Sequence, residues 1–139
     1  NCYQFIRSLR MNKRQIKLSC YLEQLNIEVV KVEMILNQLN RLKNNQEIAN
    51  YIIERDLLKT KCQLELSLAS LCIILRKMCE NQFITLNQER RKDINSIIHS
   101  NRFDFFEDDK VYVFSQKGQE EVNIIQLLDY AKKIFKEIV

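Results

Sequence analysis

Proline and glycine are almost missing from this sequence, which contains no proline and one glycine, Gly118. Average usage in a chain of 139 residues would give roughly seven prolines and about ten glycines. Proline breaks the interior of a helix and glycine weakens it, so their scarcity favours long uninterrupted helices. The abundance of Asn, Ile and Lys is typical of an AT-rich genome, which depletes both residues and accounts for part of this signal.

Long apolar runs are missing as well. The run Leu71–Leu75 is followed by Arg76 and Lys77 and is far shorter than the roughly 18 residues that a membrane span needs. We therefore expect no transmembrane segment, and an intracellular protein that is cytoplasmic or nuclear. With 46% hydrophobic and 29% charged residues, the chain is too apolar for a disordered tail. It begins at Asn1 without a signal-like apolar region, which favours a fragment over a processed mature form.

Cysteine occurs five times, but in no spacing typical of metal or redox sites. The cysteines form no CxxC pair, and their odd number leaves one unpaired: Cys2, Cys20, Cys62, Cys72 and Cys79. Cys72 and Cys79 would be about 10.5 Å apart along a helix, beyond disulfide reach. We expect free thiols in a reducing compartment, packed as small apolar side chains. The alternative is a secreted four-helix cytokine-like ligand, which Cys2 near a processed terminus would suit.

The residues that carry catalysis form no recognisable constellation. His99 is the only histidine, and its place beside Ile97 and Ile98 at a helix end favours a structural role. One glycine cannot form a phosphate-binding loop. An acidic group lacks the calcium-loop spacing, which favours a solvated turn: Asp104, Glu107, Asp108 and Asp109. We therefore expect no enzyme activity, no cofactor and no metal site.

The strongest local pattern is a heptad repeat between residues 18 and 39. Apolar residues follow alternating steps of four and three over three repeats: Leu18, Leu22, Leu25, Val29, Val32, Leu36 and Leu39. Other apolar residues widen this stripe: Ile27, Val30, Met34 and Ile35. A wide stripe indicates a helix packed by two neighbours, as in a bundle. We predict that the seven heptad positions form a partner-binding seam, on a helix from about residue 3 to 43.

A second long helix is expected after a break at Asn44, Asn45 and Gln46, because asparagine favours caps and turns. This helix is predicted from about residue 47 to 81, with the seam Leu57, Leu64, Leu68, Leu71, Leu75 and Met78. A second apolar stripe runs beside that seam: Cys62, Leu66, Ala69 and Ile73. Two stripes on one helix predict burial from two sides, with Leu68 and Leu71 central to the core.

Shorter elements are predicted in the rest of the chain. Thr85 and Gln88 match a capping box after a linker at 81–84, which predicts a third helix to about residue 99. The alternative is one helix continuous with the second. Residues 102–107 and 110–115 are rich in aromatic and β-branched side chains and predict a β-hairpin. A loop at 116–119 and a last helix from about 120 follow, with one apolar face: Val122, Ile125, Leu128, Phe135 and Ile138.

The fold class predicted from these elements is mainly α. We expect a long antiparallel helical hairpin, or coiled-coil-like bundle, over residues 1–100 and a small head of β-hairpin plus helix over 101–139. Helices of roughly 35 to 40 residues are about 50 to 60 Å long, so their apolar stripes need cover from outside the pair. The sequence therefore predicts a non-enzymatic scaffold or assembly subunit whose partners are helical subunits of a multiprotein complex.

A basic face is the remaining feature of the N-terminal segment. The first 17 residues carry no acid, and four of their five cations share one helical face: Arg7, Arg10, Arg14 and Lys17. Such a face suits an acidic protein partner, nucleic acid or a membrane surface, or is simply solvated. A nucleic-acid-binding helical protein is therefore a second alternative, although no recognition fold is visible in the sequence.

A short resemblance lies near the C-terminus. Lys117 and Gly118, followed by residues 127–134 (LLDYAKKI) after two long helices, are similar to a middle-module subunit of the transcriptional Mediator complex. The matching residues are common types and cover under a fifth of the chain, so they assign no family.

Overall fold

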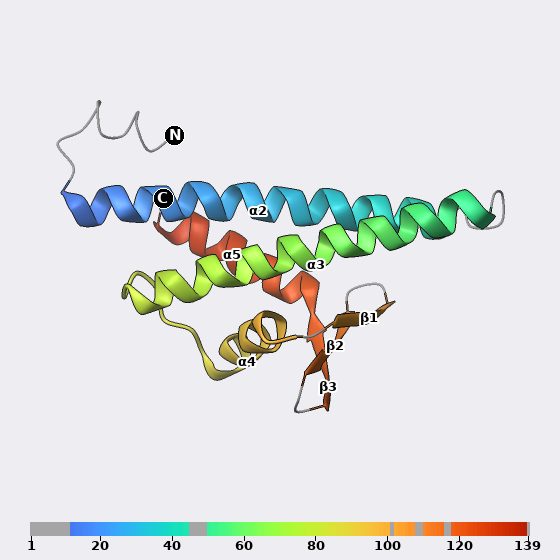
Figure 1. Ribbon diagram of the computed structural model, residues 1–139. Helices are drawn as coiled ribbons and strands as arrows, with labels where there is room; N and C mark the ends of the chain where they lie inside the picture. The colour runs from blue at the N-terminus through green and yellow to red at the C-terminus, as the bar shows by residue number, and fades with distance from the viewer. Residues whose placement is uncertain (1–11, 45–49, 101, 108–109, 116–117, 139) are drawn as a thin grey trace.

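The computed structural model describes residues 12–44, 50–100, 102–107, 110–115 and 118–138. Over these residues the chain forms two long helices, two shorter helices and a small antiparallel sheet (Figure 1). The elements in chain order are α2 (Lys13–Asn44), α3 (Asn50–Glu80), α4 (Gln88–Ile98), β1 (Arg102–Glu107), β2 (Lys110–Ser115), β3 (Gly118–Asn123) and α5 (Ile124–Ile138).

The two long helices, α2 and α3, pack side by side as an antiparallel hairpin, which confirms the predicted fold class (Figure 1). Helix α2 begins at Lys13, and the predicted helix start near residue 3 lies outside the described residues. A capping box forms at the start of α2. The Asn12 side chain accepts a hydrogen bond from the Gln15 amide at 2.8 Å, and the Gln15 side chain accepts one from the Asn12 amide at 3.0 Å.

Helix α3 ends at Glu80 in a Schellman motif, which confirms the break predicted between the second and third helices. The Phe83 amide donates to the Met78 carbonyl at 2.9 Å, and the Gln82 amide donates to the Cys79 carbonyl at 3.0 Å. Gln82 has φ 63°, the left-handed conformation that this motif requires and that glycine usually supplies. Because no glycine marks this C-terminal cap, the sequence contains no direct sign of the Schellman motif.

The third helix of the prediction is α4, but its cap differs from the predicted one. Asn87, and not Thr85, is the N-cap: its side chain accepts a hydrogen bond from the Arg90 amide at 2.8 Å. Thr85 instead lies in the linker, where its carbonyl accepts a hydrogen bond from the Tyr130 hydroxyl at 3.2 Å. Asparagine and threonine both suit the N-cap position, so the sequence offered two caps two residues apart.

The sheet has three antiparallel strands in the order β1-β2-β3, one more than the predicted hairpin. The predicted loop and helix start at 116–123 contain the third strand, in which Val122 pairs with Val111 and is buried. Gly118 opens β3 with φ +104°, a conformation that strains other residues. The prediction missed β3 because Gln119, Glu120 and Glu121 have little strand preference by themselves.

The last helix, α5, begins at Ile124 and not at residue 120. The Asn123 side chain accepts a hydrogen bond from the Gln126 amide at 2.9 Å and so caps the helix. This later start corrects the predicted apolar face: Ile125 is largely exposed, and Val122 belongs to the sheet. The buried face of α5 consists of Ile124, Leu127, Leu128, Ala131 and Ile134.

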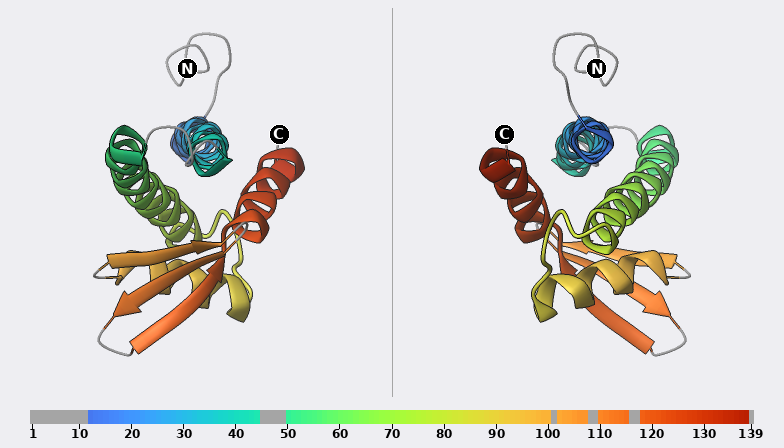
Figure 2. Two further views of the ribbon diagram at one scale, coloured as in Figure 1. Left: turned by 90° about the vertical axis from the view of Figure 1, so that its right-hand side faces the viewer. Right: turned by 90° about the vertical axis from the view of Figure 1, so that its left-hand side faces the viewer.

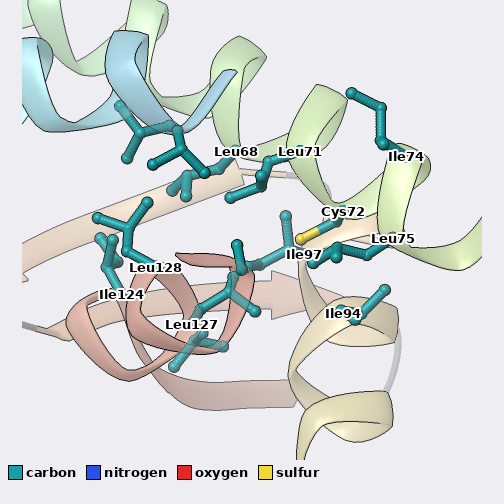
Figure 3. Packing of buried hydrophobic residues seen from close by; sticks show 14 of the residues in the cluster. Leu68, Leu71, Cys72, Ile74, Leu75, Ile94, Ile97, Ile124, Leu127 and Leu128 are labelled. Atoms are coloured by element: carbon teal, nitrogen blue, oxygen red, sulfur yellow. The ribbon is translucent and has the colours of Figure 1, made fainter. Parts of the chain in front are cut away.

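One hydrophobic cluster joins the hairpin, α4, the sheet and α5 (Figure 3). Leu68 and Leu71 are 0% exposed at its centre, as predicted, and Leu128 and Ile97 approach them from α5 and α4. Buried side chains from residues 1–100 and from 101–139 belong to this same cluster. Figure 2 shows α2, α3 and α5 grouped together, with the sheet and α4 beyond them.

Candidate functional site

The heptad seam of α2 lies inside the hairpin. Five of its seven residues are buried, and Leu18 and Leu36 are half-buried against the same core: the buried ones are Leu22, Leu25, Val29, Val32 and Leu39. Helices α3 and α5 of the chain itself contact α2. The heptad pattern therefore identified an internal contact of this chain, and a partner helix needs another face.

Two of the four residues of the predicted basic face, Arg14 and Lys17 of α2, contact the C-terminal end of α3. The Arg14 guanidinium donates to the carbonyls of Asn81 and Gln82 at 3.0 and 3.1 Å and stacks 4.3 Å from the centre of the Phe83 ring. Lys17 donates to the Asn81 side chain at 2.7 Å. Cations at a helix C-terminus offset its negative dipole and satisfy its last carbonyls.

These contacts give Arg14 and Lys17 a structural role in joining the start of α2 to the end of α3. Tyr21 strengthens the same corner, because its ring meets the Phe83 ring edge-on at 6.0 Å. Arg7 and Arg10, the other two residues of the basic face, lie outside the described residues. The role of the basic face toward nucleic acid or an acidic partner stays a prediction.

An apolar stripe on the outer face of α3 is the most exposed hydrophobic feature of that helix. Leu66 is 72% exposed, Leu58 is 65% exposed and Ile73 is 36% exposed. Cys62, which is exposed, and Ala69, which is half-buried, lie between them in sequence. We call these five residues the outer stripe: Leu58, Cys62, Leu66, Ala69 and Ile73. It includes the whole second stripe of the sequence pattern.

The outer stripe faces away from the chain's own core. At 3.6 residues per turn, it lies about 160° around α3 from the buried seam that contains Leu68 and Leu71. From Leu58 to Ile73 the stripe extends about 22 Å along the helix. The end-on views place α3 at one side of the molecule, with α2 and α5 on its other side (Figure 2). The prediction that α3 is buried from two sides is wrong for the single chain, because the structure covers only one of its two apolar stripes.

The flanks of the outer stripe carry charge of both signs. Lys59 and Lys77 are exposed and form no ion pair with another described residue. Arg76 lies 3.7 Å from Glu80, and Arg55 lies 3.9 Å from Asp56, both as exposed pairs. Exposed pairs of this kind contribute little to stability. These charged side chains are therefore available to form ion pairs with a binding partner and so to contribute to specificity.

Helix α2 carries a smaller outward patch of Ile27, Val30 and Met34. Met34 is 66% exposed, so it is comparable with Leu66 in exposure. The patch covers only two turns and contains an unbranched flexible side chain, which packs less specifically than leucine or isoleucine. It is the weaker of the two candidate surfaces and offers a matched control.

A buried charged group joins α4 to α5. The Arg90 guanidinium is 2.8 Å from the Glu89 carboxylate and 3.3 Å from that of Asp93, and it donates to the Gln126 side chain at 3.1 Å. Its Nη1 atom is buried and makes the 3.3 Å ion contact without hydrogen-bond geometry toward a described residue. Burial raises the pKa of Asp93, and the nearby Arg90 only partly offsets this. The group holds α4 and α5 together.

The cavities at these junctions are small. One of about 240 Å³ lies between α3 and α4, beside Cys79, Leu86 and Ile94. Another of about 140 Å³ lies between α2 and α5, beside Val29 and Phe135. Sites for drug-sized ligands are usually about 300 to 1,000 Å³, so neither cavity fits such a ligand.

The cysteines correct the prediction of five free thiols. Cys20 is disulfide-bonded, whereas Cys62, Cys72 and Cys79 are free and Cys2 lies outside the described residues. The spacing argument excluded only a pair within one helix, so it left pairs between distant segments open. Cys72 is fully buried, and this burial raises the pKa of its thiol well above the usual range, so it is unreactive.

The remaining polar candidates have structural positions. His99 is the C-cap of α4, and its amide donates to the Asn95 carbonyl at 3.0 Å. In the acidic group, Asp104 and Glu107 belong to β1, and Asp108 and Asp109 lie outside the described residues. Within the described ranges, no three His, Cys, Asp or Glu side chains are grouped to hold a metal ion. No helix there combines the length and apolar character of a membrane span.

Comparisons with protein-family models, with curated proteins and with solved structures find no match to this chain. The outer stripe must therefore be interpreted from its own chemistry. Of the described surfaces, it alone combines large exposed apolar side chains, a helical repeat over four turns and unpaired flanking charges.

Proposed function

We propose that this chain is a non-enzymatic assembly subunit that binds a helix of a protein partner through the outer stripe of α3. The observation that carries the proposal is the exposure of Leu58 and Leu66, by 65% and 72%, on one face of a helix whose opposite face is fully buried. Contiguous apolar surface of this kind usually marks an interaction site. An amphipathic helix in a groove or along a ridge is a common partner for it.

The energy available at the stripe suits a specific but reversible contact. Full burial of a leucine or isoleucine side chain contributes roughly 1.5 to 3 kcal/mol. Leu58 and Leu66 can contribute most of this amount, and Ile73 contributes less because it is only 36% exposed, while Cys62 and Ala69 leave room for side chains of the partner. Lys77 favours a partner with an acidic residue beside its apolar face, because opposite charges speed encounter and oppose wrong partners.

The experiment that tests this function compares two tagged variants in cells that produce the protein. Leu66→Glu places a charge in the outer stripe, and Met34→Glu places the same charge at an equally exposed position on α2. Co-purifying chains, including untagged copies of the same chain, are quantified by mass spectrometry, and thermal melting checks that both variants fold. We expect Leu66→Glu to lose the co-purifying chains and Met34→Glu to retain them. Equal recovery with both variants would contradict the proposal.

The compartment is a separate part of the proposal. The intracellular location predicted from the sequence remains our proposal, but the disulfide at Cys20 favours the alternative of a secreted helical ligand. The described residues contain two long helices with a sheet, so they differ from a bundle of four long helices. Thiol titration of protein from its native source separates the two: a free Cys20 indicates a reducing compartment, and a blocked Cys20 an oxidising one.

A further inference from the structure

Four residues of the outer stripe alternate between small and large side chains. Cys62 and Ala69 are small, whereas Leu66 and Ile73 are large, and the steps between them are four, three and four. This spacing is symmetric about the point midway between residues 67 and 68. Turning a second α3 end for end about that point places Leu66 against Ala69 of the other copy, and Cys62 against Ile73. Each large side chain then meets a small one, as knobs meet holes.

The charges beside the stripe fit the same antiparallel arrangement. One flank carries Asp56, Gln63, Ser70 and Lys77 at steps of seven. The two-fold axis places Asp56 beside Lys77 of the other copy, and Gln63 beside Ser70. Lys77 has no ion pair with a described residue, and the pair of Asp56 with Arg55 is long and exposed. A parallel pair would instead place this flank beside the opposite flank of the other copy, at residues 58, 65 and 72. Asp56 and Lys77 would then not meet, so these charges favour the antiparallel orientation.

The ends of the stripe limit the strength of this contact. Lys59 of one copy approaches Arg76 of the other, although Arg76 already has Glu80 as a counter-charge at 3.7 Å. The seam from Cys62 to Ile73 is about 16 Å long, which is short for a stable dimer. A dissociation constant on the order of tens of micromolar is therefore expected.

We propose that the helix bound by the outer stripe is α3 of a second copy of this chain, in an antiparallel pair with its two-fold axis between residues 67 and 68. The proposal rests on the proposed function and names its partner. The large-against-small layers and the pairing of Asp56 with Lys77 carry it together, because neither depends on the other.

Disulfide cross-linking of the purified full chain tests both the partner and the orientation. Cys62 should face residue 73 of the other copy, so an Ile73→Cys variant at about 200 µM, well above the expected dissociation constant, should cross-link under mild oxidation. In the antiparallel pair two Cys62 residues are too far apart to bond, since they lie about 16 Å apart along the axis. The matched control carries Ile73→Cys together with Cys62→Ser and should remain monomeric on a non-reducing gel.

A second variant keeps the test valid if Ile73→Cys disturbs the fold. Gln63→Cys with Ser70→Cys and Cys62→Ser leaves every large apolar side chain in place and should cross-link at two points per dimer. Cross-linking of the unaltered chain through Cys62 would show a parallel pair and overturn the proposal. Failure of both cysteine variants to cross-link would overturn it as well. If the cysteine variants fail to cross-link but Leu66→Glu still removes other co-purifying chains, the dimer is wrong and the proposed function holds. If Leu66→Glu removes no chain either, both proposals are wrong.

Discussion

The two faces of α3 are built from the same residue types and have opposite environments. On the inner face Leu64, Leu68 and Leu71 are completely buried, while Leu66 on the outer face is the most exposed leucine of the described chain. An apolar stripe on a long helix therefore shows only where another helix can pack. The tertiary structure decides which stripe is covered by the chain itself. The uncovered stripe is the informative one for function.

The largest expected effect separates the two faces directly. Leu71→Asp should destabilise the fold by several kcal/mol, because it places an unpaired charge in a fully buried site. Leu66→Asp should change the free energy of unfolding of the monomer by less than about 0.5 kcal/mol, because that side chain already meets solvent. Urea denaturation at low protein concentration measures both. Equal destabilisation would contradict the assignment of inner and outer faces.

Cysteine reactivity sharpens the same comparison without altering the core. Cys62 on the outer face should react with a thiol reagent at least about 100-fold faster than Cys72 on the inner face, since only thiolates react and Cys72 reacts only on opening. Peptide mapping at low concentration, where copies are separate, gives the two rates. In denatured protein that keeps the Cys20 disulfide, Cys62, Cys72 and Cys79 should all react, and Cys20 should not. Reaction of native Cys72 at the rate of Cys62 would contradict the packing.

Two cations extend the comparison from apolar to charged side chains. Arg14→Ala should cost about 1 to 2 kcal/mol, because it removes two hydrogen bonds to the end of α3 and the contact with Phe83. Lys77→Ala, which removes an exposed cation from the outer flank, should cost less than about 0.5 kcal/mol. Thermal melting of the two variants tests this difference. If Arg14→Ala left the stability unchanged, the structural role assigned to Arg14 in the basic face would be wrong.

The smallest expected effect is a pH dependence from Asp93. Its pKa is raised above the usual 3.8, so the folded state binds this proton more tightly than the unfolded state does. The contribution of Asp93 to stability is therefore greatest below pH 3.8 and decreases as the pH rises through the raised pKa. Asp93→Asn should remove this decrease. The difference in unfolding free energy between wild type and variant, followed from pH 3 to 8, measures it, and a constant difference would contradict the assignment.

Much of the fold could be predicted from the sequence because two signals were strong. Scarcity of helix breakers and the unbroken repeat from Leu18 to Leu39 predicted the hairpin, and the aromatic run from Phe103 predicted the first two strands. The third strand was missed because its sequence is polar and its order comes from pairing with β2. Helix starts at Asn12, Asn87 and Asn123 were hard to locate because asparagine is common throughout this chain.

The candidate site was only half visible in the sequence. The second stripe on α3 was identified at Cys62, Leu66, Ala69 and Ile73, but the pattern predicted burial from both sides. Periodicity records which residues share a face, and it contains nothing about whether α2, α5 or a separate molecule covers that face. For the same reason the seam from Leu18 to Leu39 was interpreted as a partner surface although the chain itself fills it.

Protection of Cys62 in the native assembly would show that a partner covers the outer stripe, because this thiol lies within the stripe and is exposed in the single chain. Its rate of modification by a membrane-permeant thiol reagent is measured in intact cells, where the protein keeps its native concentration and partners, for the unaltered chain and for Leu66→Glu. The account predicts at least about tenfold slower modification in the unaltered chain, where a partner helix covers the stripe, and fast modification in the variant. Equally fast modification of Cys62 in both would show that nothing binds the outer face of α3 and would contradict the account.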